Sequence, residues 1–238
     1  MICRKITVAG FALALVLGTA VPGLAAVLYS QPPLPSLNLG TSWTSVLDAP
    51  FSGFVTYDRF IIGSNSSITS VAWRGFAWDF QNTSNNPVNL QTINWSISFY
   101  GGANFPGNTI ASFTVPAASV STTLAGVSTF SGDPVNVYDM VFTLPSAVAV
   151  TAGTPYWFSP VSLQNTFNPI FSWSEGSGGD SSSVQCIFSV TIGSCGFVAG
   201  DRNFTLYGGP TTPEPTSIAL LGTGLVGLVG IGRRRWMR

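Results

Sequence analysis

Few side chains in this sequence could do acid–base chemistry. The chain of 238 residues has no histidine and only nine acidic residues. Without histidine, Ser-His-Asp and Cys-His arrangements are missing, as is the usual general base near neutral pH. A glycosidase needs two carboxylates at a defined separation. Aspartates near strand ends and turns, however, commonly accept hydrogen bonds from local backbone groups. We expect this role for Asp58, Asp79, Asp133, Asp139 and Asp201. We expect a non-catalytic protein that needs no cofactor, with a secreted glycosidase as an alternative.

Tryptophan side chains offer a different chemistry, because their rings can stack on sugars. The sequence has seven tryptophans, and tryptophan in an alternating strand usually fills the core. This is the expectation for Trp73 and Trp95. Trp78 and Trp173 lie nearer the ends of expected strands and are candidate glycan platforms. A carbohydrate-binding module for matrix polysaccharide is therefore one candidate function.

The N-terminus has the three parts of a secretory signal peptide. Arg4 and Lys5 form a positive region, residues 6–17 form an apolar run, and small residues follow in "GLAA". This pattern predicts export through the Sec machinery and cleavage after Ala25, so that residues 1–25 are removed. An uncleaved anchor is the alternative, but the apolar run is short for a span of about 20 residues.

Export determines how the cysteines are interpreted. Cys3 lies within the signal, so only Cys186 and Cys195 remain. Two cysteines in an oxidising compartment usually pair, and we expect a disulfide, with two buried free thiols as the alternative. No metal site is expected, because two thiolates without histidine do not complete a tetrahedral zinc shell. A structural Ca²⁺ site stays open, although no EF-hand loop or dense aspartate pattern supports it.

The charge distribution argues against nucleic-acid binding. Between residues 26 and 211 the only basic side chains are Arg59, Arg74 and Arg202, against eight acidic ones, which gives three minus eight, or −5. This part of the chain has no lysine. A protein that neutralises phosphates needs a basic face, and we expect no nucleic-acid partner.

Short apolar runs separated by turn-forming residues predict an all-β domain. Ile93, Trp95, Ile97 and Phe99 alternate with polar residues, as in a strand with one buried face. Nine such segments are expected at 51–62, 68–80, 91–102, 109–115, 136–144, 154–163, 169–174, 183–192 and 203–208. We expect them to form one antiparallel β-sandwich or jelly-roll-like domain over residues 40–209. A proline-rich leader at 26–39 is expected to be extended and unpaired, and 175–183 to be an exposed flexible loop.

The C-terminal segment, residues 210–238, has the features of a short membrane helix followed by a positive stop. Residues 217–232 are apolar and glycine-spaced, and Arg233, Arg234 and Arg235 follow. The last 15 residues of this run would span about 22 Å as a helix, short of a hydrocarbon core of about 30 Å. Its G-x-G-x-x-G pattern lies outside any βαβ unit, so it does not predict a nucleotide site. The arginines would stay on the cytoplasmic side.

This segment resembles the PEP-CTERM sorting signal of Gram-negative bacteria. The resemblance rests on Pro213, Glu214 and Pro215, the short helix after them and the terminal arginines. It implies exosortase, a membrane transpeptidase, as the partner that reads the signal and processes the chain near the Pro-Glu-Pro motif. It also implies an inner-membrane intermediate, and then the cell surface or extracellular matrix as the destination. The same tail is also catalogued as an ice-binding protein C-terminal motif.

The region between the two signals is similar to a domain type that commonly precedes this C-terminal sorting signal in the chain. The similarity rests on segments that occur in the same order, among them "SVAWRGFAWDF", "VTAGTPYWFSPVS" and "NFTLYG". It implies no activity. We expect an exported protein of the surface or exopolysaccharide matrix. Ice binding is a weaker alternative, since Ser121-Thr122-Thr123 is too short for the regular threonine array that a flat ice-binding face needs.

Overall fold

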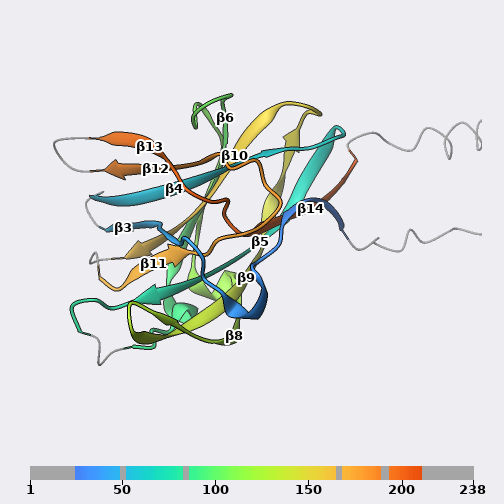
Figure 1. Ribbon diagram of the computed structural model, residues 1–238. Coiled ribbons are helices and arrows are strands. Elements are labelled where there is room, and N and C mark those ends of the chain that lie inside the picture. The colour runs from blue at the N-terminus through green and yellow to red at the C-terminus, as the bar shows by residue number, and fades with distance from the viewer. Residues whose placement is uncertain (1–24, 49–51, 83–85, 165–167, 189–192, 211–238) are drawn as a thin grey trace, which may run out of the picture.

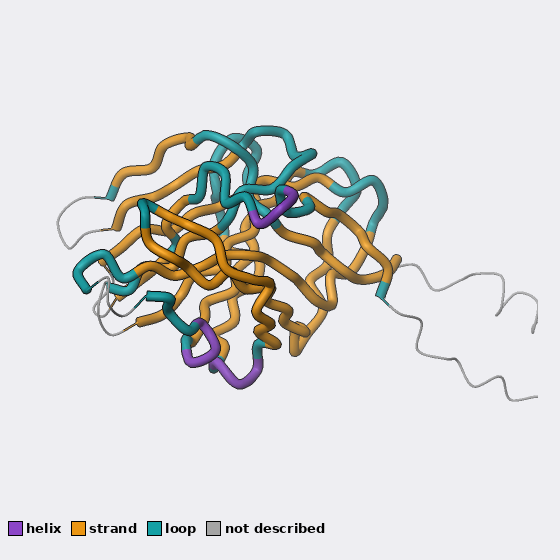
Figure 2. Tube along the Cα trace, turned by 60° about the horizontal axis from the view of Figure 1, so that its bottom comes forward, coloured by secondary structure: helices purple, strands orange, loops and turns teal. Residues whose placement is uncertain are grey.

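The computed structural model describes residues 25–48, 52–82, 86–164, 168–188 and 193–210, and these form two facing β-sheets (Figures 1 and 2). The first sheet contains β1 (Ala26–Gln31), β2 (Trp43–Thr44), β5 (Ser66–Trp78), β8 (Ser121–Phe130), β9 (Asp133–Val150), β11 (Ile170–Trp173) and β14 (Phe204–Pro210). The second contains β3 (Val46–Asp48), β4 (Ser52–Ile61), β6 (Asn94–Gly101), β7 (Thr109–Val115), β10 (Pro155–Gln164), β12 (Ser183–Phe188) and β13 (Ser194–Val198). Three-residue 3-10 turns are η1 (Pro35–Leu37), η3 (Leu90–Thr92) and η4 (Ala117–Ser119).

The expected all-β class is confirmed, and each of the nine predicted segments contains a strand. The strand pairs are antiparallel except for β10 with β3. In the first sheet, β5 lies between β14 and β9, and β8 continues the sheet beyond β9. In the second, β4 and β6 flank β10, and β7 forms one edge.

The core between the sheets is largely aromatic. Trp73 on β5 and Trp95 on β6 are buried, and their rings meet edge-to-face with centroids 5.3 Å apart. Phe158 on β10 and Phe204 on β14 meet across the same space at 5.2 Å. Each pair joins one sheet to the other, so burial of these rings provides the hydrophobic stabilisation that holds the sheets together.

The predicted alternation is confirmed in two strands. Trp95, Ile97 and Phe99 of β6 are fully buried, as their positions in the sequence indicate. In β9, the side chains of Tyr138, Met140, Phe142 and Leu144 all face the core. Ser98 of β6 is a correction, because it is buried on the opposite face, where its hydroxyl lies 2.8 Å from that of Ser112.

The expectation of an unpaired leader at 26–39 is wrong. Residues 26–31 form β1, which pairs antiparallel with β14 so that Ala26 lies opposite Gly208. The ring of Tyr29 packs against Phe60 and Phe204 of the core. Prolines 32, 33 and 35 follow this strand and end it, because proline cannot donate to a strand ladder.

The segment at 175–183 is only partly the exposed loop that we expected. Glu175 forms a β-bridge with Arg202, and Gly176 forms one with Pro33. Residues 177 and 178 are exposed, but Ser183 at the start of β12 is fully buried. The loop is therefore fixed at both ends. Its start contacts Pro33 and Arg202, and at its end the Ser183 hydroxyl donates to the carbonyl of Gly200.

The predicted signal peptide and C-terminal helix lie outside the described residues. In the part of the chain that the structure describes, no helical segment has the length and hydropathy of a membrane span. Figure 1 shows the end of β14 beside the start of β1 at one end of the sheets, as their pairing requires.

Candidate functional site

The two tryptophans predicted as glycan platforms occupy different environments. Trp173 is fully buried, and its indole N–H donates to the carbonyl of Asn203 at 2.6 Å. The prediction of an exposed platform at Trp173 is therefore wrong, since its ring faces the core and packs against Phe158 of the opposite sheet and Phe204. Trp78 is half-buried, donates to Asp133 at 2.9 Å, and meets the ring of Phe130 edge-to-face at 5.3 Å. Trp78 is therefore partly exposed, and its role as a glycan platform stays a prediction.

Asp58 lies in the middle of β4, fully buried, and not at a strand end as expected. Its Oδ1 accepts a hydrogen bond from the Gln31 side chain at 3.2 Å. Its Oδ2 accepts from the backbone N–H of Arg202 and lies 2.8 Å from the Ser183 hydroxyl. Burial raises the pKa of Asp58 to about 8, because removal from water penalises the charged form.

Arg202 is the fully buried cation beside this carboxylate. Its guanidinium donates to backbone carbonyls of Thr41, Trp173 and Ala199, the last at 2.8 Å. Burial lowers the pKa of Arg202 to about 10, against the opposing effect of nearby carboxylates, chiefly Asp58. In the described structure its Nε has no hydrogen-bond partner.

Together these residues form a buried polar cluster, which we define as Gln31, Asp58, Ser183, Asp201 and Arg202. The carboxylate of Asp201 accepts from the backbone N–H of Ser181 at 2.6 Å, and burial raises its pKa. The cluster joins β1, β4, β12 and the turn before β14. Because Asp58 and Arg202 are inaccessible to solvent, the arrangement suits a structural clasp and not contact with a substrate. Within the described residues, no three His, Cys, Asp or Glu side chains gather as metal ligands would.

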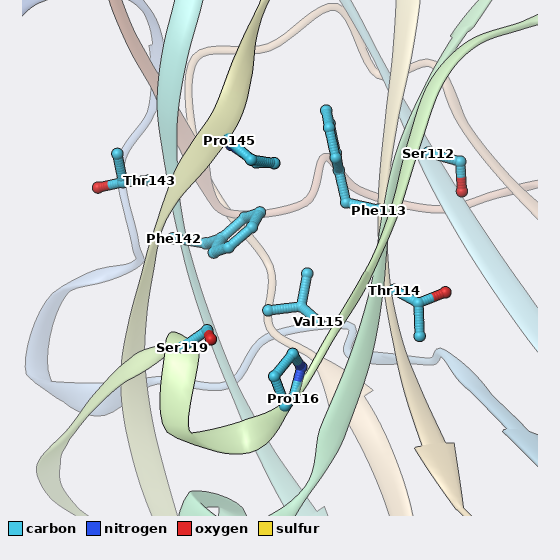
Figure 3. Close-up of a pocket in the computed structure, with 9 residues that line it drawn as sticks. All are labelled: Ser112, Phe113, Thr114, Val115, Pro116, Ser119, Phe142, Thr143 and Pro145. Carbon is cyan, nitrogen blue, oxygen red and sulfur yellow. The ribbon is translucent and has the colours of Figure 1, made fainter.

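An apolar hollow on the described surface lies between β7 of one sheet and β9 of the other (Figure 3). Its volume is about 560 Å³, and its lining carries no charged side chain. Figure 3 shows Phe113 and Val115 from β7 facing Phe142 and Pro145 from β9, while Ser112 and Thr143 point away. The cleft is apolar and offers few groups with which to orient a polar ligand.

A second hollow, of about 310 Å³, lies on the outer face of the first sheet. We call it the Arg74 hollow, and its lining includes Ala72, Arg74, Asp139, Val141, Thr205 and Tyr207. Arg74 and Asp139 are direct neighbours on β5 and β9, and they form a bidentate ion pair at 2.7 and 2.8 Å. The pair is accessible, since 17% of the Arg74 side chain and 47% of the Asp139 side chain are exposed. In the hollow, the planar guanidinium of Arg74 provides hydrogen-bond donors beside the acceptor oxygens of the Asp139 carboxylate.

The sequence contained part of the signal for this site. In β5 and β9, Arg74 and Asp139 occupy positions that alternate with buried apolar residues, which places them on the outer face. Their pairing depends on the register of two strands that are 65 positions apart in the chain. Sequence reasoning missed it, because alternation fixes a face and not a neighbour.

The predicted disulfide is present. Cys186 on β12 and Cys195 on β13 are directly opposite in register and are bonded. Cys186 is buried, whereas Cys195 lies on the exposed edge strand. The bond ties β13 to the sheet.

The predicted sorting residues Pro213, Glu214 and Pro215 and the stop residues Arg233, Arg234 and Arg235 lie outside the described residues. Residues 211–235 match the family model described as the PEP-CTERM protein-sorting motif. This motif indicates an exported protein that exosortase sorts at the membrane of a Gram-negative bacterium. No curated protein and no solved structure matched the chain.

Proposed function

We propose that this chain, which carries a PEP-CTERM sorting motif, is a non-catalytic protein of the cell surface or exopolysaccharide matrix. Exosortase releases it from its membrane-bound precursor at the Pro-Glu-Pro motif. The observation that carries the proposal is the match of residues 211–235 to the sorting motif, directly after the last strand of the domain.

The path of the chain through the fold supports this order of events. β1 begins at Ala26, directly after the predicted signal-peptide cleavage site, and pairs with the end of β14 at Gly208. The chain therefore enters and leaves the domain at neighbouring points on one edge. Adjacent ends suit a precursor whose N-terminal signal and C-terminal segment both enter one membrane, because both ends of the folded domain then face the same surface.

Four carboxylates of the described region are engaged in ways that support a non-catalytic role. The charge of Asp201 adds to the rise in the pKa of Asp58, but both side chains are buried. Asp139 is held by Arg74, and Asp180 by Arg59 at 2.7 Å. Retaining and inverting glycosidases need two carboxyl groups on either side of a substrate, and this buried pair has no access to one.

Mass spectrometry of the protein recovered from the producing bacterium tests the proposal. With exosortase present, we expect a mature chain that begins at Ala26 and ends near residues 213–215. In an exosortase deletion strain, the chain should instead extend to Arg238 and stay in the membrane fraction. A variant with Pro213, Glu214 and Pro215 all replaced by alanine is the matched control and should behave as in the deletion strain. An intact chain to Arg238 in the presence of exosortase contradicts the proposal.

A further inference from the structure

We propose that the Arg74 hollow binds a neutral polysaccharide, by hydrogen bonds from Arg74 and Asp139 to adjacent sugar hydroxyls and by contact of a sugar ring with Tyr207. The inference rests on the proposed matrix function, which places the domain among polysaccharides. It concerns a different part of the molecule from the sorting motif, so the two can be tested separately.

The strand register brings the binding groups together on one open face. Thr205 on β14, Ala72 on β5 and Val141 on β9 lie in one row across three strands. Arg74 and Asp139 occupy the next row along the same strands. Tyr207 lies two residues from Thr205 and faces the same side, because strand side chains alternate. The row of small side chains forms a floor, with charged groups at one side and an aromatic ring at the other.

The ion pair suits recognition of a sugar better than stabilisation of the fold. Accessible ion pairs contribute little to folding stability, typically about 0–1 kcal/mol. Asp139 holds the guanidinium through Nε and Nη2, so the planar group is fixed before a ligand arrives. Nη1 of Arg74 can then donate a hydrogen bond to a ligand, and the neighbouring carboxylate oxygens of Asp139 can accept one. Each hydroxyl of a sugar ring has one O–H donor and two acceptor lone pairs, so one hydroxyl can accept from Nη1 while its neighbour donates to the carboxylate.

The apolar part of the hollow complements the other face of a sugar ring. Tyr207 lies at one side of this floor, and the floor residue Val141 is 41% exposed, while Ala72 leaves the floor low. Aromatic side chains combine an apolar face with a polar tip and are common where a partly wet ligand binds. Pro33 also lines the hollow, next to the end of β1. The volume of about 310 Å³ is at the lower end of ligand pockets, which are about 300–1,000 Å³.

The charge of the site selects a neutral ligand. Arg74 is already neutralised by Asp139, so the hollow carries no net charge for an acidic group. The region from 26 to 211 has a net charge of three minus eight, or −5, and no lysine. An acidic polysaccharide would be repelled by this field. The apolar cleft of Figure 3 lacks charged groups altogether and is the weaker site for a sugar.

Affinity electrophoresis of the full chain in mild detergent tests the proposal. The gels contain hydroxyethyl cellulose, dextran or galactomannan as neutral probes and alginate as the acidic probe. We expect retardation by at least one neutral polymer and none by alginate. Arg74→Met and Tyr207→Ala should each weaken this binding about ten- to hundredfold, as loss of a charged hydrogen bond or of an aromatic contact does. Arg59→Met, which breaks the accessible ion pair of Arg59 with Asp180, is the matched control and should bind as the native chain does.

Folding of each variant is checked by its thermal unfolding midpoint. Ala72→Gln provides a second variant that removes no native contact and fills the floor of the hollow with a longer side chain. It should abolish binding with little change in the midpoint. Failure of all three neutral polymers to retard the native chain would overturn the proposal. Equal binding by the native chain and Ala72→Gln, or retardation by alginate alone, would also overturn it. None of these outcomes bears on processing at residues 213–215.

Discussion

The hydroxyl of Ser183 lies 2.8 Å from Oδ2 of Asp58 and 2.7 Å from the carbonyl oxygen of Gly200. A serine hydroxyl has one hydrogen, so it cannot donate to both oxygens at once. Both contacts are satisfied if Asp58 is protonated, because Asp58 then donates to Ser183 and Ser183 donates to Gly200. Burial, the largest influence on the pKa of Asp58, likewise favours the neutral form, whereas the hydrogen bonds that Asp58 accepts from Gln31 and the Arg202 backbone favour the charged form.

The first prediction is that the domain loses stability as the pH rises through neutrality. Burial raises the folded-state pKa of Asp58 to about 8, above the ordinary value of about 4. The folded state then binds more protons than the unfolded state between these values. The free energy of unfolding should be highest below pH 4, fall by up to about 1.4 kcal/mol per pH unit, and level off above pH 8. Urea unfolding at several pH values measures this.

Asp58→Asn separates this effect from other titrations. The amide is neutral at every pH and nearly the same shape, so most of the fall in stability should disappear. A smaller slope of the same sign should persist, because burial also raises the pKa of Asp201. Asp180→Asn, at the accessible ion pair with Arg59, should keep the native slope. A native slope in Asp58→Asn would show that Asp58 is ionised in the folded state.

A second prediction concerns Trp173. Its ring is fully buried between the sheets, in contact with Phe158 at 5.6 Å and Phe204 at 5.9 Å. Trp173→Ala should lower the free energy of unfolding by about 3–5 kcal/mol, as large-to-small core substitutions of this kind do. Trp78→Ala, at a half-buried ring, should cost less. An unchanged unfolding midpoint for Trp173→Ala would contradict the core assignment.

The sequence identified strands well where one face is apolar. The alternation in β6 and β9 depends only on residues two positions apart, and that pattern is local. It failed for β1, whose partner Gly208 and its neighbours lie at the far end of the chain. The prolines after β1 were interpreted as signs of an extended leader, although they only end the strand. Pairing between distant segments leaves no local pattern.

The functional residues show the same division. Cys186 and Cys195 could be paired from the sequence, since they were the only two cysteines after the signal. Trp173 and Asp58 could not be placed, because their burial depends on which strands flank β11 and β4. The position of a strand in the sequence does not show whether it is central in its sheet. Residues near its end are then covered by neighbours that the sequence does not reveal.

A third prediction tests whether β1 belongs to the folded domain. Tyr29 packs its ring 5.5 Å from Phe204 and 5.9 Å from Phe60, and its hydroxyl accepts from Gln31 at 2.8 Å. Tyr29→Ala should lower the free energy of unfolding by about 2–4 kcal/mol through loss of these contacts. Tyr29→Phe keeps the ring and loses only the hydrogen bond, so about 1 kcal/mol is expected. Equal stability of Tyr29→Ala and the native chain in urea would show that β1 contributes nothing to the fold.

The last prediction concerns the disulfide. Cys186 and Cys195 are nine positions apart and close a short loop. In the chain-entropy account, a loop of this size stabilises the fold by about 2.5–3 kcal/mol. Among the described strands β13 pairs with β12 alone, so reduction should open this edge first. With dithiothreitol, we expect a lower unfolding midpoint and faster hydrogen exchange at residues 194–198 than in β4 or β10. Replacement of both cysteines by alanine should reproduce these changes without reductant, and dithiothreitol should then have no further effect. If reduction accelerates exchange equally in all strands, the bond stabilises the whole domain and not its edge.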